Sequence, residues 1–329
     1  MARQRQLIGI WILVAFATLW FLRAASTVLI PIALAVLISY ALEPPVAWLE
    51  RRHVHRMIGS SAVLLLVLGG LTAAAYALRD DATRMIAALP TAAERAREMV
   101  ISRVGFNADA LAQGQTTGSV IERVVSAVFA FAGHLVVIIF LVFFLLISGH
   151  HVRSRLVEIM GPAADDRRTV ATIIDDINAH IQRYLLVLLF TGTVVAVSTW
   201  IVLAWMGVEH AAMWGLLAGI FNSIPYFGPV VVAGGLFGVG IVQGGGISQA
   251  LQMSAAAIVI TSLEGWLLTL PLMGKVERMS ALVVFIGLLL WTWVWGAWGT
   301  VLAVPMLVIV KSTADHIPRL RPISRLMAP

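Results

Sequence analysis

Long stretches without a charged residue dominate this chain and predict membrane-spanning helices. They cover residues 6–22, 24–42, 57–78, 124–152, 184–208, 210–263 and 279–310. A helix needs about 20 apolar residues, each rising about 1.5 Å, to cross a hydrocarbon core of about 30 Å. Most of the stretches therefore fit one helix, but 210–263 and 279–310 are too long for one. The apolar pattern resumes after Glu264, which predicts a further helix at roughly 248–272.

Both long stretches contain residues that interrupt a helix. In the first, Asn222–Pro229 holds two prolines, which lack the backbone N–H that a helix needs. In the second, Gly296 and Gly299 lie among four tryptophans. Glycine loosens a helix, and tryptophan is typical of the membrane surface, so the chain is expected to turn there.

These breaks predict an all-α integral membrane protein with six full transmembrane helices plus two re-entrant helical hairpins, at about 211–243 and 281–311. The alternative is eight transmembrane helices. Broken backbone at membrane depth is tolerated only where it is buried in protein or lines a cavity, which favours the hairpins.

The charge pattern divides the chain into regions. We expect transmembrane helices 1–3 in 1–78, an amphipathic extracytoplasmic segment at 79–120, transmembrane helix 4 at 121–148, a cytoplasmic helical segment at 149–183, a transmembrane region with broken helices at 184–311 and a basic cytoplasmic tail at 312–329. Basic residues are commoner in the segments that lie inside when the N-terminus is inside. This bias predicts that both termini are cytoplasmic.

Two local patterns give further expectations. Glu43 stands before Pro44 and Pro45, which predicts a helix end at the cytoplasmic surface. The glycine pairs spaced four apart predict close helix packing. They are Gly215/Gly219, Gly234/Gly238 and Gly240/Gly244.

Composition excludes several other classes of protein. Hydrophobic residues make up 60% of the chain and charged residues 12%, too few charges to cover a soluble protein of 329 residues. The pI near 10.4 reflects a net charge of only +6, so we expect no nucleic-acid partner. The chain has no cysteine, which excludes thiol catalysis and cysteine metal sites.

No catalytic motif is present, so we expect no enzyme and no cofactor. The chain lacks a Walker A loop, so ATP cannot drive transport from it. Asp176 and His180 share a helix face, but two ligands are too few for a metal site.

Several segments together resemble the autoinducer-2 exporter family, also called the PerM-like membrane proteins. The matching segments, which span most of the chain, are Leu29–Ala35, Tyr40–Glu50, Ile224–Pro229, Leu263–Gly265, Pro271–Lys275 and Gly296–Met306. The resemblance implies a multi-spanning transporter of the bacterial inner membrane and a homo-oligomer. It also implies export of autoinducer-2 or sodium/proton exchange as activities of relatives, and it gives Pro44 a role in a turn.

Glu264 is the leading candidate for a functional residue. It lies inside an apolar helix, where a charge costs about 2.5–3.5 kcal/mol on insertion scales. Such residues face a cavity, bind an ion or carry protons. The alternative is a structural role, in which Glu264 caps a broken helix or pairs with Lys275 or Arg278.

The break at Asn222–Pro229 is the second candidate. Unwound backbone frees carbonyl and N–H groups for a ligand. Asn222 and Tyr226 add side-chain hydrogen bonds, and Pro225, Gly228 and Pro229 shape the turn. The alternative is a tight hairpin turn without ligand contact. Gly296 and Gly299 are candidates for gating, together with Lys275 and Arg278.

These residues predict a transporter that moves a small solute through the lipid bilayer. We expect Glu264 to carry H⁺ or Na⁺, and one mobile part to carry both hairpins. A sodium/proton antiporter without an organic substrate is the first alternative. A non-transporting oligomeric membrane scaffold is the second.

Overall fold

The fold is described from a computed structural model of the chain. The described residues are 13–104 without 15, 135–149, 154–159 without 156, 164–243, 246–273, 279–317 and 320–328. Throughout these residues the regular structure is helical, with no strand. The expectation of an all-α membrane protein is confirmed.

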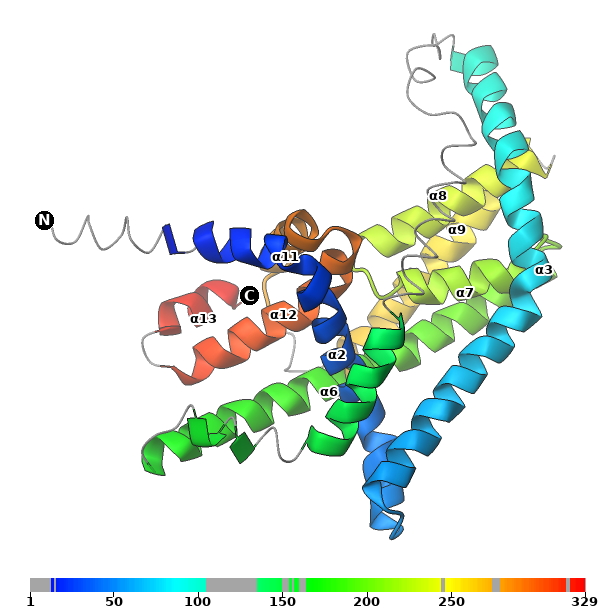
Figure 1. The fold of residues 1–329 in the computed structure, drawn as a ribbon. Helices are drawn as coiled ribbons and strands as arrows, with labels where there is room; N and C mark the ends of the chain where they lie inside the picture. The colour runs from blue at the N-terminus through cyan, green and yellow to red at the C-terminus, as the bar shows by residue number, and fades with distance from the viewer. Residues whose placement is uncertain are drawn as a thin grey trace, which may run out of the picture. The chain divides into compact units, whose positions relative to one another are not determined.

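Figure 1 shows the helices of the described residues. Their bounds are α2 Ser26–Arg51, α3 Arg56–Val104, α6 Ala164–Trp205, α7 Ala211–Phe221, α8 Phe227–Val242, α9 Gly246–Glu264, a π-helix Gly265–Thr269, α10 Leu270–Met273, α11 Ala281–Trp295, α12 Ala297–His316 and α13 Arg321–Met327. A further helix covers Leu135–Gly149.

Five helical stretches among the described residues are long and apolar enough to cross a membrane. They are Ser26–Arg51, Arg56–Arg84, Arg167–Trp205, Gly246–Leu272 and Ala297–His316. Four of them correspond to full spans expected from the sequence. The fifth, α12, falls in a segment expected to form half of a hairpin. Of the first expected span, 6–22, residues 6–12 and 15 lie outside the described residues, and the rest is helical.

Both long apolar stretches turn back on themselves. Helices α7 and α8 contact each other and are joined through 222–226, and α11 and α12 contact each other and are joined through Gly296 alone. Gly296 has φ +61°, a conformation that glycine adopts at little steric cost. The breaks expected at Asn222–Pro229 and at Gly296 are therefore present as short turns, each between two helices that contact each other.

The helix end expected at Glu43 is wrong. Helix α2 continues through Pro44 and Pro45 to Arg51, so Pro44 lies inside a helix rather than in a turn. Neither proline can donate to the helical ladder. On either side of the prolines, the Arg56 guanidinium holds the Glu43 carboxylate at 2.8 Å and the Glu50 carboxylate at 3.0 Å.

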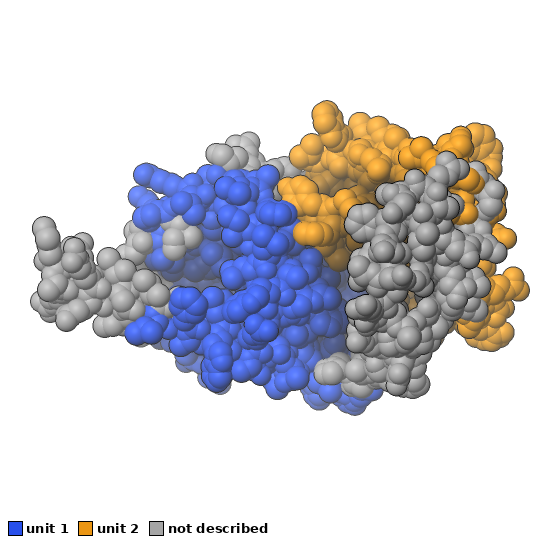
Figure 2. All heavy atoms as spheres, turned by 90° about the horizontal axis from the view of Figure 1, so that it is seen from above, with its two compact units in different colours: residues 1–64, 134–185, 274–329 blue, residues 65–133, 186–273 orange. Residues whose placement is uncertain are grey.

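The chain forms two compact units, coloured separately in Figure 2. Unit 1 comprises residues 1–64, 134–185 and 274–329, and unit 2 comprises 65–133 and 186–273. The α11–α12 hairpin belongs to unit 1 and the α7–α8 hairpin to unit 2. A single part carrying both hairpins, as the sequence led us to expect, is therefore wrong.

In unit 2, α7 packs closely on α6 through glycine. A Cβ atom on Gly215 would lie 2.5 Å from the carbonyl oxygen of Ala196, and one on Gly219 would lie 2.5 Å from that of Gly192. These contacts confirm close packing for this pair. The expectation is wrong for Gly234 and Gly238, which have nothing within 4 Å of the added atom.

In unit 1, two tryptophans near the end of α11 contact residues close to the N-terminus. The Trp295 indole N–H donates to the Leu22 carbonyl over 2.8 Å, and Trp295 is 7% exposed. Trp293, by contrast, is exposed, and the Arg23 guanidinium carbon lies over its ring, 4.9 Å from the ring centre. The cluster therefore joins the N-terminal helix to the α11–α12 turn.

Candidate functional site

The connection between α7 and α8 contains a strained turn centred on Tyr226. Tyr226 has φ 65° and ψ −47°, and the Phe227 N–H donates to the Pro225 carbonyl over 2.7 Å. This is a three-residue γ-turn with positive φ, a rare conformation for any residue that carries a side chain. Strain of this kind costs of order 1–3 kcal/mol and clusters at functional sites.

Gly228 allows the turn to close against the end of α7. A Cβ atom at Gly228 would lie 1.8 Å from the Phe221 carbonyl oxygen, so no other residue fits without a shift of backbone. Pro229 lies in the first turn of α8, where a helix does not need the missing N–H. The two prolines and Gly228 thus form the turn that the sequence indicated.

Two polar side chains of this turn, Asn222 and Tyr226, make no side-chain hydrogen bond within the described residues. Asn222 is half-buried and Tyr226 is 54% exposed. Within the described residues, neither side chain has a hydrogen bond to another side chain or to the backbone. Both can therefore bind a ligand without breaking an existing bond.

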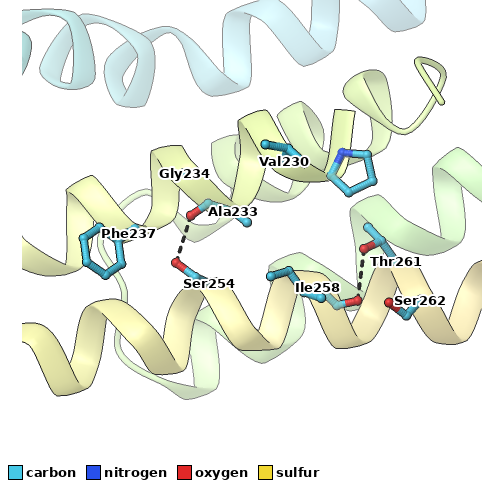
Figure 3. A pocket seen from close by; sticks show the side chains of 9 residues that line it. Val230, Ala233, Gly234, Phe237, Ser254, Ile258, Thr261 and Ser262 are labelled. Carbon is cyan, nitrogen blue, oxygen red and sulfur yellow. Dashed lines mark hydrogen bonds between the residues drawn. The ribbon is translucent and has the colours of Figure 1, made fainter. Parts of the chain in front are cut away.

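A groove of about 560 Å³ runs between α8 and α9 (Figure 3). Helix α8 contributes an apolar wall and α9 contributes three hydroxyl groups. The lining residues are Pro229, Val230, Ala233, Gly234, Phe237, Ser254, Ile258, Thr261 and Ser262. Ser254 donates to the Ala233 carbonyl over 2.8 Å and so joins the two walls. Pro229 thus faces the same groove as Thr261 and Ser262, which shortly precede Glu264.

Glu264 is buried at the point where α9 becomes a π-helix. Its side chain is 7% exposed, and Thr269 Oγ1 donates to Glu264 Oε1 over 2.5 Å. In a π-helix the backbone bonds join residues five apart, which brings Thr269 over Glu264. Single π-helical turns of this kind occur frequently at functional sites.

Glu264 differs from the other buried polar residues because its side chain can carry a charge. In the part of the chain that the structure describes, it is the only buried side chain that can carry a charge. Its Oε2 atom has no hydrogen-bond donor among those residues, whereas Oε1 is held by Thr269. Thr269 therefore positions one carboxylate oxygen, and the other has no donor within the described part of the chain.

The structure brings some of the expected residues together and separates others. Asn222, Pro225, Tyr226, Gly228, Pro229 and Glu264 all belong to unit 2. Gly296 and Gly299 belong to unit 1, where a Cβ atom on Gly299 would lie 1.8 Å from the Trp291 carbonyl oxygen. Lys275 and Arg278 lie outside the described residues, so pairing with Glu264 stays a prediction.

Sequence reasoning missed Thr269 and the hydroxyl groups of the groove. Helical spacing of three or four residues does not connect Glu264 with Thr269, because only a π-helix aligns residues five apart. Ser254 and Thr261 were detectable, since a spacing of seven residues puts two hydroxyl groups on one face of an apolar helix. Asp81 was also missed: its carboxylate lies 2.8 Å from His210 Nδ1 at the start of α7.

Comparison with known proteins shows the family of the chain. The model of the family described as AI-2E family transporter matches residues 8–319. The chain belongs to the AI-2E transporter family. It is 25% identical to "Putative transport protein YhhT" of Escherichia coli K12, over 88% of this chain and 85% of that protein. It is 24% identical to "AI-2 transport protein TqsA" of the same strain, over 90% of this chain and 88% of that protein.

A third relative, "Putative permease PerM" of Escherichia coli K12, is 24% identical over 89% of this chain and 88% of its own length. These AI-2E relatives are bacterial transport proteins and permeases by name. The chain is accordingly a multi-pass membrane transporter.

Proposed function

We propose that this AI-2E family member moves a small solute across the membrane and that Glu264 carries a coupling H⁺ or Na⁺. The observation that carries the proposal is the buried Glu264 at the start of a π-helix, with one oxygen held by Thr269. The α7–α8 turn and the groove that begins at Pro229 form part of the solute path in this proposal.

The energetics of Glu264 support a role in binding a cation. A charge near the centre of a membrane helix costs about 2.5–3.5 kcal/mol on insertion scales. One hydrogen bond to a charged group returns about 1.5–3 kcal/mol, and Thr269 supplies one. A proton or sodium ion at Oε2 removes the remaining cost, because it neutralises or pairs the charge. Binding and release there couple an ion gradient to the conformation of α9.

The groove supports transport of a small, uncharged solute. None of its nine lining residues is charged. Ser254 and Thr261 donate their hydroxyl hydrogens to backbone carbonyls, so their oxygens can accept from a solute on an otherwise apolar surface. Sites for small molecules have this composition in general. Because one relative is named an AI-2 transport protein, autoinducer-2 is the first solute to test, and export is the direction to test first.

A second candidate function is sodium/proton exchange without an organic solute. Glu264 favours it, because one buried carboxylate is sufficient to bind Na⁺ and H⁺ in turn. The two functions differ in whether a solute is needed for ion movement.

Proteoliposomes loaded with autoinducer-2 separate these possibilities. We expect efflux that accelerates when a proton or sodium gradient is imposed, and we expect Glu264→Gln to lose the acceleration. Glu209→Gln is the matched control, because Glu209 is an exposed carboxylate of the same unit. Ion exchange without solute favours the second candidate. If wild type moves neither solute nor ions, the proposal is wrong and a scaffold role takes its place.

A further inference from the structure

The turn between α2 and α3 carries basic side chains that the fold does not use. Residues 52–55 join the two helices, and His53 has φ 66°, which makes the turn sharp. Arg51, Arg52 and His53 are exposed. Two permanent positive charges therefore stand next to each other at the end of a pair of membrane-spanning helices.

Arg56 forms ion pairs with the acidic residues near this turn, Glu43 and Glu50. Its Nη2 atom donates to both carboxylate oxygens of Glu43, its Nη1 atom donates to Glu50, and its Nε atom donates to the Leu146 carbonyl over 2.7 Å. The Arg56 side chain is only 13% exposed. Within the described residues, Arg51 and Arg52 consequently have no acidic partner.

Arg52 is held in place without being neutralised. Its guanidinium carbon lies 4.8 Å from the centre of the Trp48 ring, and Trp48 is 54% exposed. A ring beneath the guanidinium covers one face and leaves the N–H groups at its edge free to bind an anion. The stack fixes the direction of those donors.

The neighbours of the turn are apolar and exposed. Met57 is 53% exposed and Ile58 62% exposed, in the first turn of α3. Tryptophan beside arginine at the end of a membrane helix is typical of the headgroup layer. Exposed apolar side chains beside two arginines suit a lipid, which offers acyl chains next to a charged headgroup.

We propose that this turn binds the headgroup of an anionic phospholipid. The lipid phosphate accepts hydrogen bonds from Arg51 and Arg52, and the upper part of an acyl chain lies against Trp48 and Ile58. Arginine suits the site because its planar donors match phosphate oxygens. A basic residue near an anionic membrane surface contributes about 1 kcal/mol to binding, so the two arginines together strengthen it roughly 30-fold.

Native mass spectrometry with phosphatidylglycerol and phosphatidylcholine tests this proposal. We expect the wild-type protein to retain phosphatidylglycerol preferentially, and the Arg51→Gln/Arg52→Gln variant to bind it roughly 30-fold more weakly. The matched control is Arg79→Gln, since Arg79 also stacks on an aromatic ring, 4.1 Å from Tyr76, but has Asp80 at 3.4 Å. Retention equal in all three proteins overturns the proposal.

Two further measurements keep the result interpretable. The single variant Arg52→Gln leaves Arg51 in place and is measured in case the double variant folds poorly. We expect it to lose part of the preference for phosphatidylglycerol. Excess inorganic phosphate is added in parallel. We expect it to leave phosphatidylglycerol bound, because the acyl chain contributes to affinity. Complete displacement by phosphate contradicts a lipid site.

Discussion

Thr269 donates its hydroxyl hydrogen to Glu264 Oε1 over 2.5 Å, and the two residues are five positions apart along the chain. The spacing is that of a π-helix, in which the Leu270 N–H also reaches back to the Gly265 carbonyl. In the proposed function, this bond leaves the other carboxylate oxygen for the coupling ion. The bond depends on the local winding of the helix, because only a π-helix aligns residues five apart.

Removing this hydroxyl should impair coupling. Thr269→Val has nearly the same volume but lacks the donor, so Glu264 loses its only donor within the described residues. A hydrogen bond to a charged group is worth about 1.5–3 kcal/mol, which corresponds to a loss of ten-fold or more in ion-driven transport. Thr269→Ser keeps the hydroxyl and should retain most of the activity. Equal rates for the two variants in proteoliposomes would show that the bond has no role.

The α7–α8 turn should not tolerate a side chain at Gly228. The added Cβ atom of Gly228→Ala meets the Phe221 carbonyl oxygen at 1.8 Å, which forces the backbone apart. We expect a loss of roughly 3 kcal/mol in stability, at the upper end of the usual cost of overpacking. Thermal unfolding in detergent measures it.

Gly238→Ala is the control for that variant, in the same helix. Nothing lies within 4 Å of its added atom, and alanine favours a helix over glycine by about 1 kcal/mol. It should leave the melting temperature unchanged or raise it. A Gly228→Ala protein as stable as Gly238→Ala would mean that the turn closes differently.

Arg56 should be essential for the stability of unit 1. Its substitution by glutamine leaves Glu43 and Glu50 without their cation and frees the Leu146 carbonyl. Breaking a fully buried pair costs about 3–5 kcal/mol, and the partial exposure of the two carboxylates lowers this to roughly 2 kcal/mol. Arg155→Gln is the control, because the Arg155 pair with Glu158 is largely exposed. Chemical unfolding of both variants should separate them clearly.

The proposed orientation can be tested with single cysteines, since the chain contains none of its own. With both termini in the cytoplasm, a cysteine at Thr83, near the end of the apolar part of α3, should react with a membrane-impermeant maleimide in intact cells. A cysteine at Ser324, in α13, should react only after permeabilisation. The opposite pattern would invert the topology.

The positions of the helices and of their breaks could be predicted from the sequence better than the contacts between side chains. Pro225 and Pro229 mark the α7–α8 turn because proline acts locally on the backbone. Glu264 was identifiable because a charge stands out in an apolar helix. Its partner was not, since the winding that aligns Thr269 depends on how α9 packs.

Contacts beyond one helical turn explain what the sequence pattern missed. Pro44 and Pro45 predict a helix end, yet α2 continues past them, and Arg56, from the start of the next helix, bonds to Glu43 and Glu50. The tryptophan cluster predicts a turn of the chain, and that turn is present at Gly296. The bond of the Trp295 indole N–H to the Leu22 carbonyl, 273 positions away, could not be predicted from a local pattern.

The central claim is that Glu264 binds the coupling ion, and inside-out vesicles with a pH-sensitive dye test it most directly. Sodium is added to vesicles that carry wild type, Glu264→Gln or Glu209→Gln, with and without autoinducer-2. We expect proton movement in wild type and in Glu209→Gln, and none in Glu264→Gln. Proton movement that persists undiminished in Glu264→Gln would contradict the claim.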